Sequence, residues 1–451
     1  MPKTSQVELS KRTELELDLL ALMTHQDAHG VKTYPDNFIN NCPTSHEIQK
    51  RELRRLHLGG GIRANYNLRK KGGQEHFKFI DLFAGIGGFR LAGDSAGGKC
   101  LFTSEKDKFA RISYFINYGE VPFGDITILA NSDNVGKIPD HDVLCGGFPC
   151  QAFSISGDRL GFADPRGSLF FNIIDILKNK INSGNPVKVV FLENVRNFEK
   201  HDSEKTFKRV QDELVRLGYS VNWAVLNSGN FGAATTRERI YIVAIRDENF
   251  PDVNVVSDFK AAFAKLKKLK PDPKFLKDHY LDKLSDKEAE SYIIPEDRIM
   301  TDMNQLEERD LIAAQNNRAQ PIQIGCIGKK GDSRMGRQGE RIYSIHGQAI
   351  TFSAYGGGLA ARTGAYRTIS KTGATQIRKL TPSECAKIMG FFRTKSDGQI
   401  KPMDVKALRE QGLSDWQLYK QFGNSVVVPT VEKIYRLIAD HLFPEKLSLP
   451  E

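Results

Sequence analysis

The sequence first defines a fold at Phe77–Gly93, FKFIDLFAGIGGFRLAG. An apolar run typical of a buried strand leads into a glycine-rich turn, and a helical pattern follows. Helical stretches separate the further strand candidates that lie before Asp247, which are KCLFTSE, HDVLCGGF, VKVVFLENV and RIYIVAIRD. This alternation predicts an α/β fold built on a doubly wound, mostly parallel sheet.

The composition limits the class of protein. The chain has 451 residues and a formal net charge of +10 at pH 7. This length allows two or three domains, and the charge indicates a polyanionic partner, although a solvated basic surface would give the same value. No C-x-x-C pair occurs, which argues against a zinc site, so we expect no metal. The sequence contains no signal core or membrane-spanning run, and we expect a cytoplasmic protein without membrane contact.

Changes in pattern divide the chain. Residues 1–75 form a basic extension with two helical stretches, SQVELSKRTELELDLLALM and HEIQKRELRRLHL. Two interpretations stay open for it, a DNA-contacting helical module and a solvated tail. A β-like pattern with glycine turns replaces the helical one over 320–375. The predicted boundaries give units at 1–75, 76–262, 263–375, 376–414 and 415–451.

The glycine turn suggests a ligand at one end of the sheet. Glycines at 85, 87 and 88 let backbone N–H groups at a helix N-terminus approach a bound molecule. Such a turn alone is weak evidence. Glu105 ends the next strand, where a carboxylate can accept bonds from ribose hydroxyls, and Asp125 could accept from an adenine amino group. The turn has no phosphate-binding lysine, so the pattern favours an adenosine without phosphates.

A cysteine lies just past another strand end, in GGFPCQAFS at 146–154. Most free cysteines are small buried hydrophobes, but Cys150 follows a strand at the edge where α/β sheets place their sites. Arg237 and Arg239 are candidates for lowering its pKa. Glu193 ends the strand VVFLENV, where burial would raise its pKa and let it donate a proton, although a structural ion pair is the commoner role.

Together these segments resemble DNA cytosine-5 methyltransferases. The matching blocks run in the family's order between residues 77 and 440, as DLFAGIGGFR, GGFPCQAFS, LENV, TTRERIY, RKLTPSECAKIMGF and QFGNSVVVP. GERIYSIHGQAITFSAYGGG is similar to members that modify GCGC. The resemblance implies the fold of S-adenosylmethionine-dependent methyltransferases, with 76–262 and 415–451 as the catalytic domain. It also implies a smaller β-rich target-recognition domain at 263–375 and a hinge at 376–414.

The resemblance implies a function as well. It predicts S-adenosyl-L-methionine as cofactor, double-stranded DNA as partner and a role in a restriction–modification system. It also implies a monomer in the prokaryotic cytoplasm, associated with the nucleoid. Cys150 would attack ring carbon six of a flipped cytosine, and Glu193 would protonate or hydrogen-bond ring nitrogen three. Arg237 and Arg239 would hold the carbonyl oxygen of the base and orient Glu193.

The resemblance extends to the remaining site residues. Those expected at the cofactor are Phe83, Gly85, Gly88, Glu105, Lys106, Asp125, Ile126, Pro149, Leu169, Asn424 and Ser425. Those expected at the DNA are Ser156, Gln338, Arg341, Thr351, Ser353, Tyr355, Gly356 and Gly357. Ser156 and Gln338 would fill the hole that the flipped base leaves. Two departures stand out, because Lys106 replaces a tryptophan that packs on adenine and Thr235-Thr236 replaces a Gln-Lys pair.

Two alternative functions are open. A tRNA cytosine-5 methyltransferase would share the cofactor blocks and Cys150, although the GCGC-like block argues against it. A DNA-binding autoregulator would use residues 1–75 to control its own gene, and this role could coexist with the enzyme.

Overall fold

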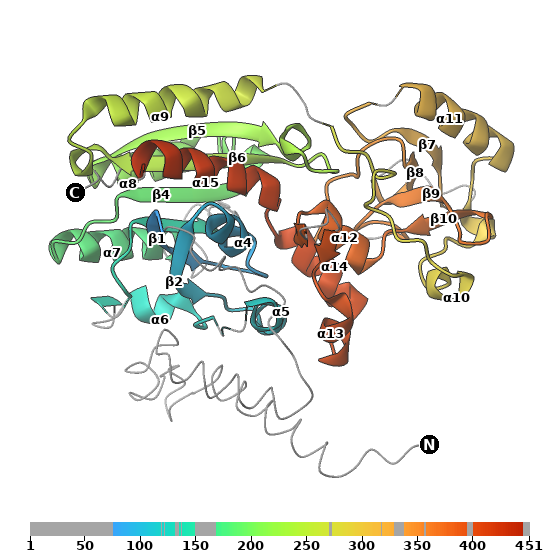
Figure 1. The fold of residues 1–451 in the computed structure, drawn as a ribbon, viewed down its shortest axis with the longest axis horizontal. Coiled ribbons are helices and arrows are strands. Elements are labelled where there is room, and N and C mark those ends of the chain that lie inside the picture. The colour runs from blue at the N-terminus through green and yellow to red at the C-terminus, as the bar shows by residue number, and fades with distance from the viewer. Residues whose placement is uncertain are drawn as a thin grey trace, which may run out of the picture.

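The fold was analysed in a computed structural model. It describes residues 75–118, 120, 122–130, 135–136, 138–148, 168–269, 273–316, 318–328, 338–355, 358–394 and 400–444. The predicted extension, apart from Glu75, lies outside these residues. In Figure 1 a larger α/β body lies on the left and a smaller β-rich body on the right, with short helices between them.

The larger body is built on a mixed sheet. Its strands are β1 Phe77–Leu82, β2 Gly98–Ser104, β3 Val143–Gly147, β4 Val189–Val195, β5 Tyr219–Asn227 and β6 Glu238–Arg246. Within the described residues they lie in the order β2-β1-β3-β4-β6-β5. The pairs from β2 to β4 are parallel, and β6 runs antiparallel to both β4 and β5. The sheet therefore has the mostly parallel character that the sequence predicts.

Helices cover both faces of this sheet. One face packs against α4 Gly88–Ser95, α5 Lys108–Tyr118, α9 Val253–Lys265 and α15 Val428–Leu442. The other packs against α6 Ile126–Ala130, α7 Ser168–Asn182 and α8 Lys205–Arg216. Alternate residues of β4 enter different cores, with Phe191 on the first face and Leu192 on the second. Burial on both faces explains why the central strands read as unbroken apolar runs.

The end of the chain returns to the sheet, as the sequence predicts. Helix α15 packs against α4 and α9, and Val428 donates a backbone hydrogen bond to Met389 at 3.0 Å. A Cβ on Gly88 would lie 2.6 Å from a methyl carbon of Val426. Only glycine at 88 lets the first turn of α4 approach the segment before α15 this closely.

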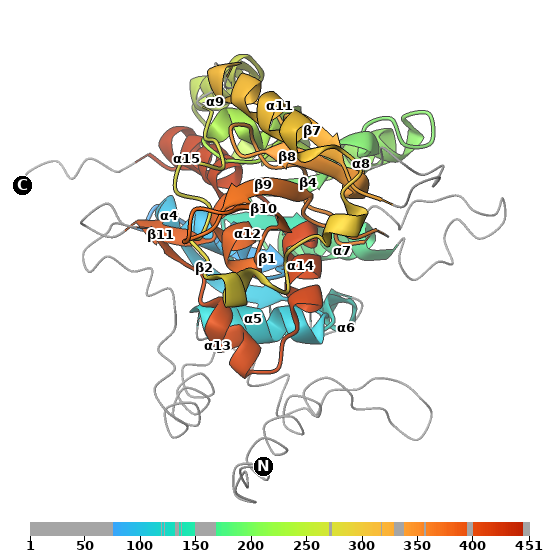
Figure 2. The ribbon, with the colours of Figure 1, turned by 90° about the vertical axis from the view of Figure 1, so that its right-hand side faces the viewer.

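A second mixed sheet forms the smaller body. Its strands are β7 Gln323–Cys326, β8 Arg341–Ser344, β9 Ala365–Ile369 and β10 Thr375–Lys379, in the order β10-β9-β8-β7 within the described residues. Helices α10 Asp286–Ala289 and α11 Met303–Asn316 accompany it. Ile324, Ile342 and Ile377 from three strands share its core with Leu306 of α11. Figure 2 views the molecule from the side of this sheet.

Short elements join the two bodies. They are α12 Pro382–Ile388, β11 Phe392–Thr394, β12 Ile400–Pro402, α13 Val405–Glu410 and α14 Asp415–Asn424. The remaining turns are 3₁₀ helices at Arg196–Phe198, Ser228–Phe231, Asp247–Asn249, Leu266–Lys268, Glu296–Arg298 and Gln338–Glu340. The buried Glu384 caps α12 and pairs with Arg378 at 2.7 Å, so the end of β10 is tied to these helices. None of the helices in the described part of the chain has the length and hydropathy needed to cross a bilayer.

Candidate active site

A buried carboxyl–guanidinium pair lies at the end of β4. Glu193 has 9% relative exposure, and its Oε1 lies 3.1 Å from Nε of Arg239 on β6. Burial raises the pKa of Glu193, whereas Arg239 and Arg237 lower it, and the pKa remains above its ordinary value. The carboxyl therefore keeps its proton to a higher pH than a solvated glutamate, which suits a proton donor.

The strand that leads to Cys150 ends beside this carboxyl. Gly147 pairs with Glu193 in the parallel register of β3 and β4, and a Cβ on Gly147 would lie 3.1 Å from Glu193 Oε2. Asn194 fixes this end by donating to the carbonyl of Phe148 at 3.0 Å. The chain thus enters the segment 149–167 next to Glu193. Cys150, Pro149 and Ser156 lie outside the described residues, so their roles stay predictions.

Arg237 is buried one position before β6. Its Nη1 donates to the carbonyl of Phe352 at 3.0 Å, and its Nη2 donates to those of Gly423 and Ser425 at 2.8 Å each. Burial, together with the nearby Arg239, lowers the pKa of Arg237 to about 9. Its terminal nitrogens are thus bonded to main-chain oxygens, and its Nε has no hydrogen-bond partner among the described residues. The contact with the base that the resemblance implies stays a prediction.

The glycine turn and the end of β2 form a second corner. Glu105 Oε2 accepts from the backbone N–H of Gly85 at 2.7 Å, and Oε1 accepts from that of Asp107 at 2.7 Å. Burial raises the pKa of Glu105, although these backbone donors oppose the rise. Gly85 and Phe83 both adopt positive φ, 56° and 57°. No described atom lies within 4 Å of the position of a Cβ on Gly85, so the turn is open on that side.

Asp125 lies near the same corner. Lys106 Nζ is 2.7 Å from Asp125 Oδ2, and Thr127 donates to Oδ1 from its backbone N–H at 3.1 Å and its hydroxyl at 2.8 Å. Burial raises the pKa of Asp125, but the bonds from Lys106 and Thr127 outweigh it and leave the pKa below its ordinary value. Ile126 begins α6 and is buried, and Leu169 in α7 is partly buried.

The far end of the chain completes this corner. A Cβ on Gly88 would lie 3.3 Å from Ser425 Oγ, so the glycine turn and residue 425 are neighbours. Asn424, the last residue of α14, is exposed beside it. The structure therefore brings Gly85, Glu105, Gly88 and Ser425 together, and their role at a cofactor stays a prediction. The partly buried carboxylate of Glu105 beside an open glycine turn fits the hydroxyl groups of an adenosine-type cofactor.

The predicted DNA contacts differ in their surroundings. Tyr355 is exposed at 63%, whereas the Thr351 hydroxyl donates to the carbonyl of Thr236 at 2.5 Å. The Ser353 hydroxyl bonds to the backbone of Tyr355, and Arg341 begins β8, where it is partly buried. Gly356, Gly357 and the side chain of Gln338 are outside the described part of the structure.

The sequence analysis did not predict which carbonyl groups bond to the segment Thr235–Arg239. The Thr235 hydroxyl lies 3.2 Å from the carbonyl of Ala349 and 3.0 Å from that of Ile350. These oxygens, like that of Gly423, belong to the main chain. No residue-type signal in the sequence could have revealed them.

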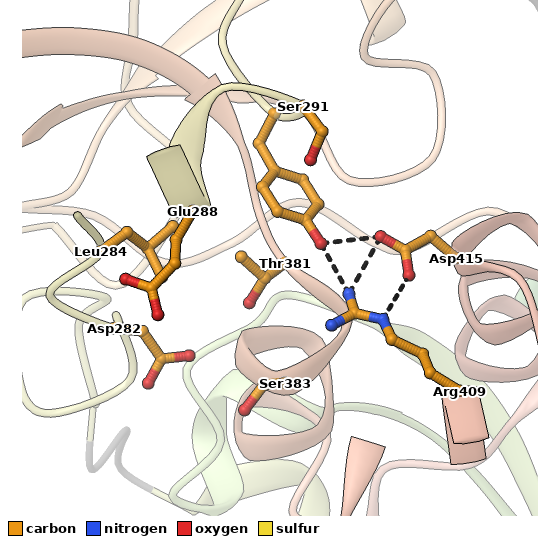
Figure 3. A pocket seen from close by; sticks show the side chains of 9 residues that line it. Asp282, Leu284, Glu288, Ser291, Thr381, Ser383, Arg409 and Asp415 are labelled. Carbon is orange, nitrogen blue, oxygen red and sulfur yellow. Dashed lines mark hydrogen bonds and ion pairs between the residues drawn. The ribbon is translucent and has the colours of Figure 1, made fainter. Parts of the chain in front are cut away.

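A polar cavity of about 420 Å³ lies elsewhere, at the junction of the smaller sheet and the C-terminal helices (Figure 3). Arg409 donates to Asp415 Oδ1 at 2.8 Å and to the Tyr292 hydroxyl at 2.6 Å, and Tyr292 donates to Asp415 Oδ2 at 2.7 Å. These groups satisfy one another's hydrogen bonds. We therefore interpret the cavity as part of the packing junction between the smaller sheet and the C-terminal helices. Across the described residues, no group of His, Cys, Asp and Glu side chains could hold a metal ion.

The sheet, the open glycine turn and the strand-end carboxyls define an α/β methyltransferase fold. Residues 77–440 match the model of the C-5 cytosine-specific DNA methylases. The chain belongs to this family and is a DNA (cytosine-5)-methyltransferase.

Individual relatives agree. The chain is 42% identical over 358 residues to the type II methyltransferase M.HhaI of Haemophilus parahaemolyticus, covering 79% of this chain and 92% of that one. It is 36% identical over 399 residues to M.HpaII of Haemophilus parainfluenzae, covering 84% and 92%. Among solved structures, the Dnmt2 methyltransferase of S. pombe has a TM-score of 0.52 at 20% identity, covering 81% of this chain and 98% of that one, which shows the fold alone.

Proposed function

We propose that the protein transfers a methyl group from S-adenosylmethionine to carbon five of a flipped-out cytosine in duplex DNA. The target is GCGC and the setting is a restriction–modification system. One observation carries the chemistry, the buried Glu193–Arg239 pair beside the strand end that leads to Cys150. Similarity to M.HhaI and the recognition block GERIYSIHGQAITFSAYGGG support the choice of target.

The residues divide the reaction between them. Carbon five of cytosine is too weak a nucleophile to take a methyl group directly. The Cys150 thiolate forms a bond to ring carbon six while Glu193 gives a proton to ring nitrogen three, which raises the electron density at carbon five. After methylation, a base removes the proton from carbon five, the bond to the Cys150 sulfur breaks to restore the thiolate, and ring nitrogen three returns its proton to Glu193. Arg239 holds Glu193 in place throughout.

The corner at Glu105 holds the cofactor. Gly85 and Gly88 provide the close backbone approach, Glu105 accepts from the ribose hydroxyls, and Asp125 accepts from the adenine amino group. Phe83, Ile126, Leu169 and Pro149 supply apolar contacts, and Asn424 and Ser425 close the site. When bound, S-adenosylmethionine supplies an activated methyl group.

Recognition and flipping belong to the smaller body and to the segment after Cys150. A stacked base cannot be attacked from above its plane, so the cytosine leaves the duplex. Ser156 and Gln338 fill the resulting hole, and the other contacts come from Arg341, Thr351, Ser353, Tyr355, Gly356 and Gly357. The protein acts as a monomer in the prokaryotic cytoplasm, where its DNA is found.

A methyl-transfer assay tests the proposal. Purified protein is given cofactor with a radiolabelled methyl group and one of three substrates: a GCGC duplex, duplexes with one base pair of the site changed, or tRNA. We expect label only in the GCGC duplex, at carbon five by bisulfite sequencing, and none with Cys150→Ser. Label in tRNA but not in duplex DNA would overturn the substrate assignment, and label in another duplex would overturn the target.

A further inference from the structure

The segment Thr235–Arg239 is bonded to parts of the chain that are far away in sequence. Arg237 is 2% exposed and donates to the carbonyls of Phe352, Gly423 and Ser425. Phe352 belongs to the predicted DNA-contacting stretch, and Ser425 belongs to the predicted cofactor corner. One guanidinium group therefore joins both ligand-facing segments to the strand that carries Arg239.

The two threonines strengthen one of these connections. Ala349 donates to the carbonyl of Ala234 at 2.7 Å, and Thr236 donates from its backbone N–H to that of Ala349 at 3.0 Å. Thr235 and Ala349 form a parallel β-bridge, which the Thr235 hydroxyl reinforces by approaching the Ala349 and Ile350 carbonyls. Segments 234–237 and 349–352 therefore form one hydrogen-bonded unit.

Arg239 follows this unit, two residues after Arg237. Arg237 and Arg239 are separated by one residue in extended chain, so their side chains leave the same face of the strand. Arg239 pairs with Glu193 at 3.1 Å, and Val195 of β4 is its register partner. A displacement of Arg237 would therefore move Arg239 relative to the carboxyl.

We infer that Arg237 is a positioning residue, which uses its bonds to Phe352, Gly423 and Ser425 to hold Arg239, and through it Glu193, in register with bound DNA and cofactor. This inference rests on the proposed function. It gives Arg237 a role other than direct contact with the base, which its terminal nitrogens support by bonding to main-chain oxygens of both segments.

A double-mutant cycle separates the two roles. Single-turnover methyl transfer is measured for Arg237→Met, Arg239→Met and the double variant, with Arg436→Met as a control for loss of an exposed arginine on α15. Misplacing a catalytic group by about 1 Å can lower the rate about 100-fold. We expect a loss of this size for Arg237→Met, while the double variant is no slower than Arg239→Met within about threefold, since acting through Arg239 makes the losses non-additive. Multiplicative losses would overturn the inference and favour direct contact with the base.

Hydrogen exchange gives a second readout that needs no turnover. We expect faster exchange in peptides covering 349–355 and 421–427 of Arg237→Met, with unchanged exchange in β1. Thr235→Val, which replaces the hydroxyl by a methyl group of similar size, should speed exchange at 349–352 alone. Unchanged exchange in both variants would overturn the inference. Failure of the proposed function would look different, since the wild-type protein would then transfer no methyl group to cytosine.

Discussion

Two glutamates at the ends of parallel strands, the buried Glu193 and the partly buried Glu105, are held in different ways. Burial raises the pKa of both Glu193 and Glu105. Glu193 faces a guanidinium group, whereas the two oxygens of Glu105 accept from backbone N–H groups of Gly85 and Asp107. Arg239 acts on Glu193 through one ion pair, whereas backbone N–H donors bond to both oxygens of Glu105 and favour a permanent acceptor. The Glu193 corner is therefore suited to proton transfer and the Glu105 corner to binding.

Removing each carboxylate tests this contrast most strongly. Glu193→Gln keeps the shape but loses the proton donor, so single-turnover methyl transfer should fall by about 10²- to 10⁴-fold. Glu105→Gln should act mainly on binding, raising the KM for the cofactor with a smaller change in kcat. Isothermal titration with S-adenosylhomocysteine distinguishes a loss of binding from a loss of catalysis, because Glu193→Gln should bind S-adenosylhomocysteine with normal affinity. A large loss of kcat with normal binding in Glu105→Gln would contradict the assignment of Glu105 to binding and Glu193 to proton transfer.

The pH dependence of the rate sharpens the comparison. The proton on Glu193 is needed, so the rate should fall as pH rises through the raised pKa of this group. Arg239 lowers that pKa, so Arg239→Gln should raise it and move the falling limb to higher pH. Rate profiles of both proteins at saturating cofactor measure the shift. If the falling limb of the Arg239→Gln rate profile moved to lower pH, a group other than Glu193 would control the loss of rate at high pH.

The sequence predicted β1, β3, β4 and β6, whose central residues are buried and read as apolar runs, and it also predicted the edge strand β2 from KCLFTSE. It missed β5, Tyr219–Asn227, which lies at the edge of the described sheet and pairs with β6. Ser220 and Asn222 of this strand are only partly buried, so its apolar pattern is interrupted. A half-covered strand carries a weaker signal than a central one.

The candidate site was likewise predictable from the sequence only in part. The strand-end positions of Glu105 and Glu193 were predictable, because α/β sheets place ligands at the carboxyl ends of their strands. The bonds of Arg237 were not, since their acceptors are main-chain oxygens 115 and 186 residues away. The pairing of Lys106 with Asp125 was equally hidden, because an exposed lysine has many possible partners.

The smallest expected effect concerns this pair in the cofactor corner. Lys106 is 72% exposed at its side chain and lies 2.7 Å from Asp125, so it competes with a ligand amino group for the carboxylate. Exposed ion pairs contribute about 0–1 kcal/mol, so Lys106→Met should tighten S-adenosylhomocysteine binding by no more than about fivefold. The difference should vanish at about 1 M salt, where the Debye length falls to about 3 Å.

Lys99→Met is the matched control for Lys106→Met. Lys99 lies on β2, the strand that leads to Lys106, and pairs with Glu75 at 3.2 Å, away from the glycine turn. It should leave the Kd for S-adenosylhomocysteine unchanged at every salt concentration. Weaker binding by Lys106→Met would mean that the lysine stem packs on the ligand, since its methylene groups can cover apolar surface. In that case residue 106 would stabilise the bound adenosine by contact, and its bond to Asp125 would orient the stem without competing with the ligand.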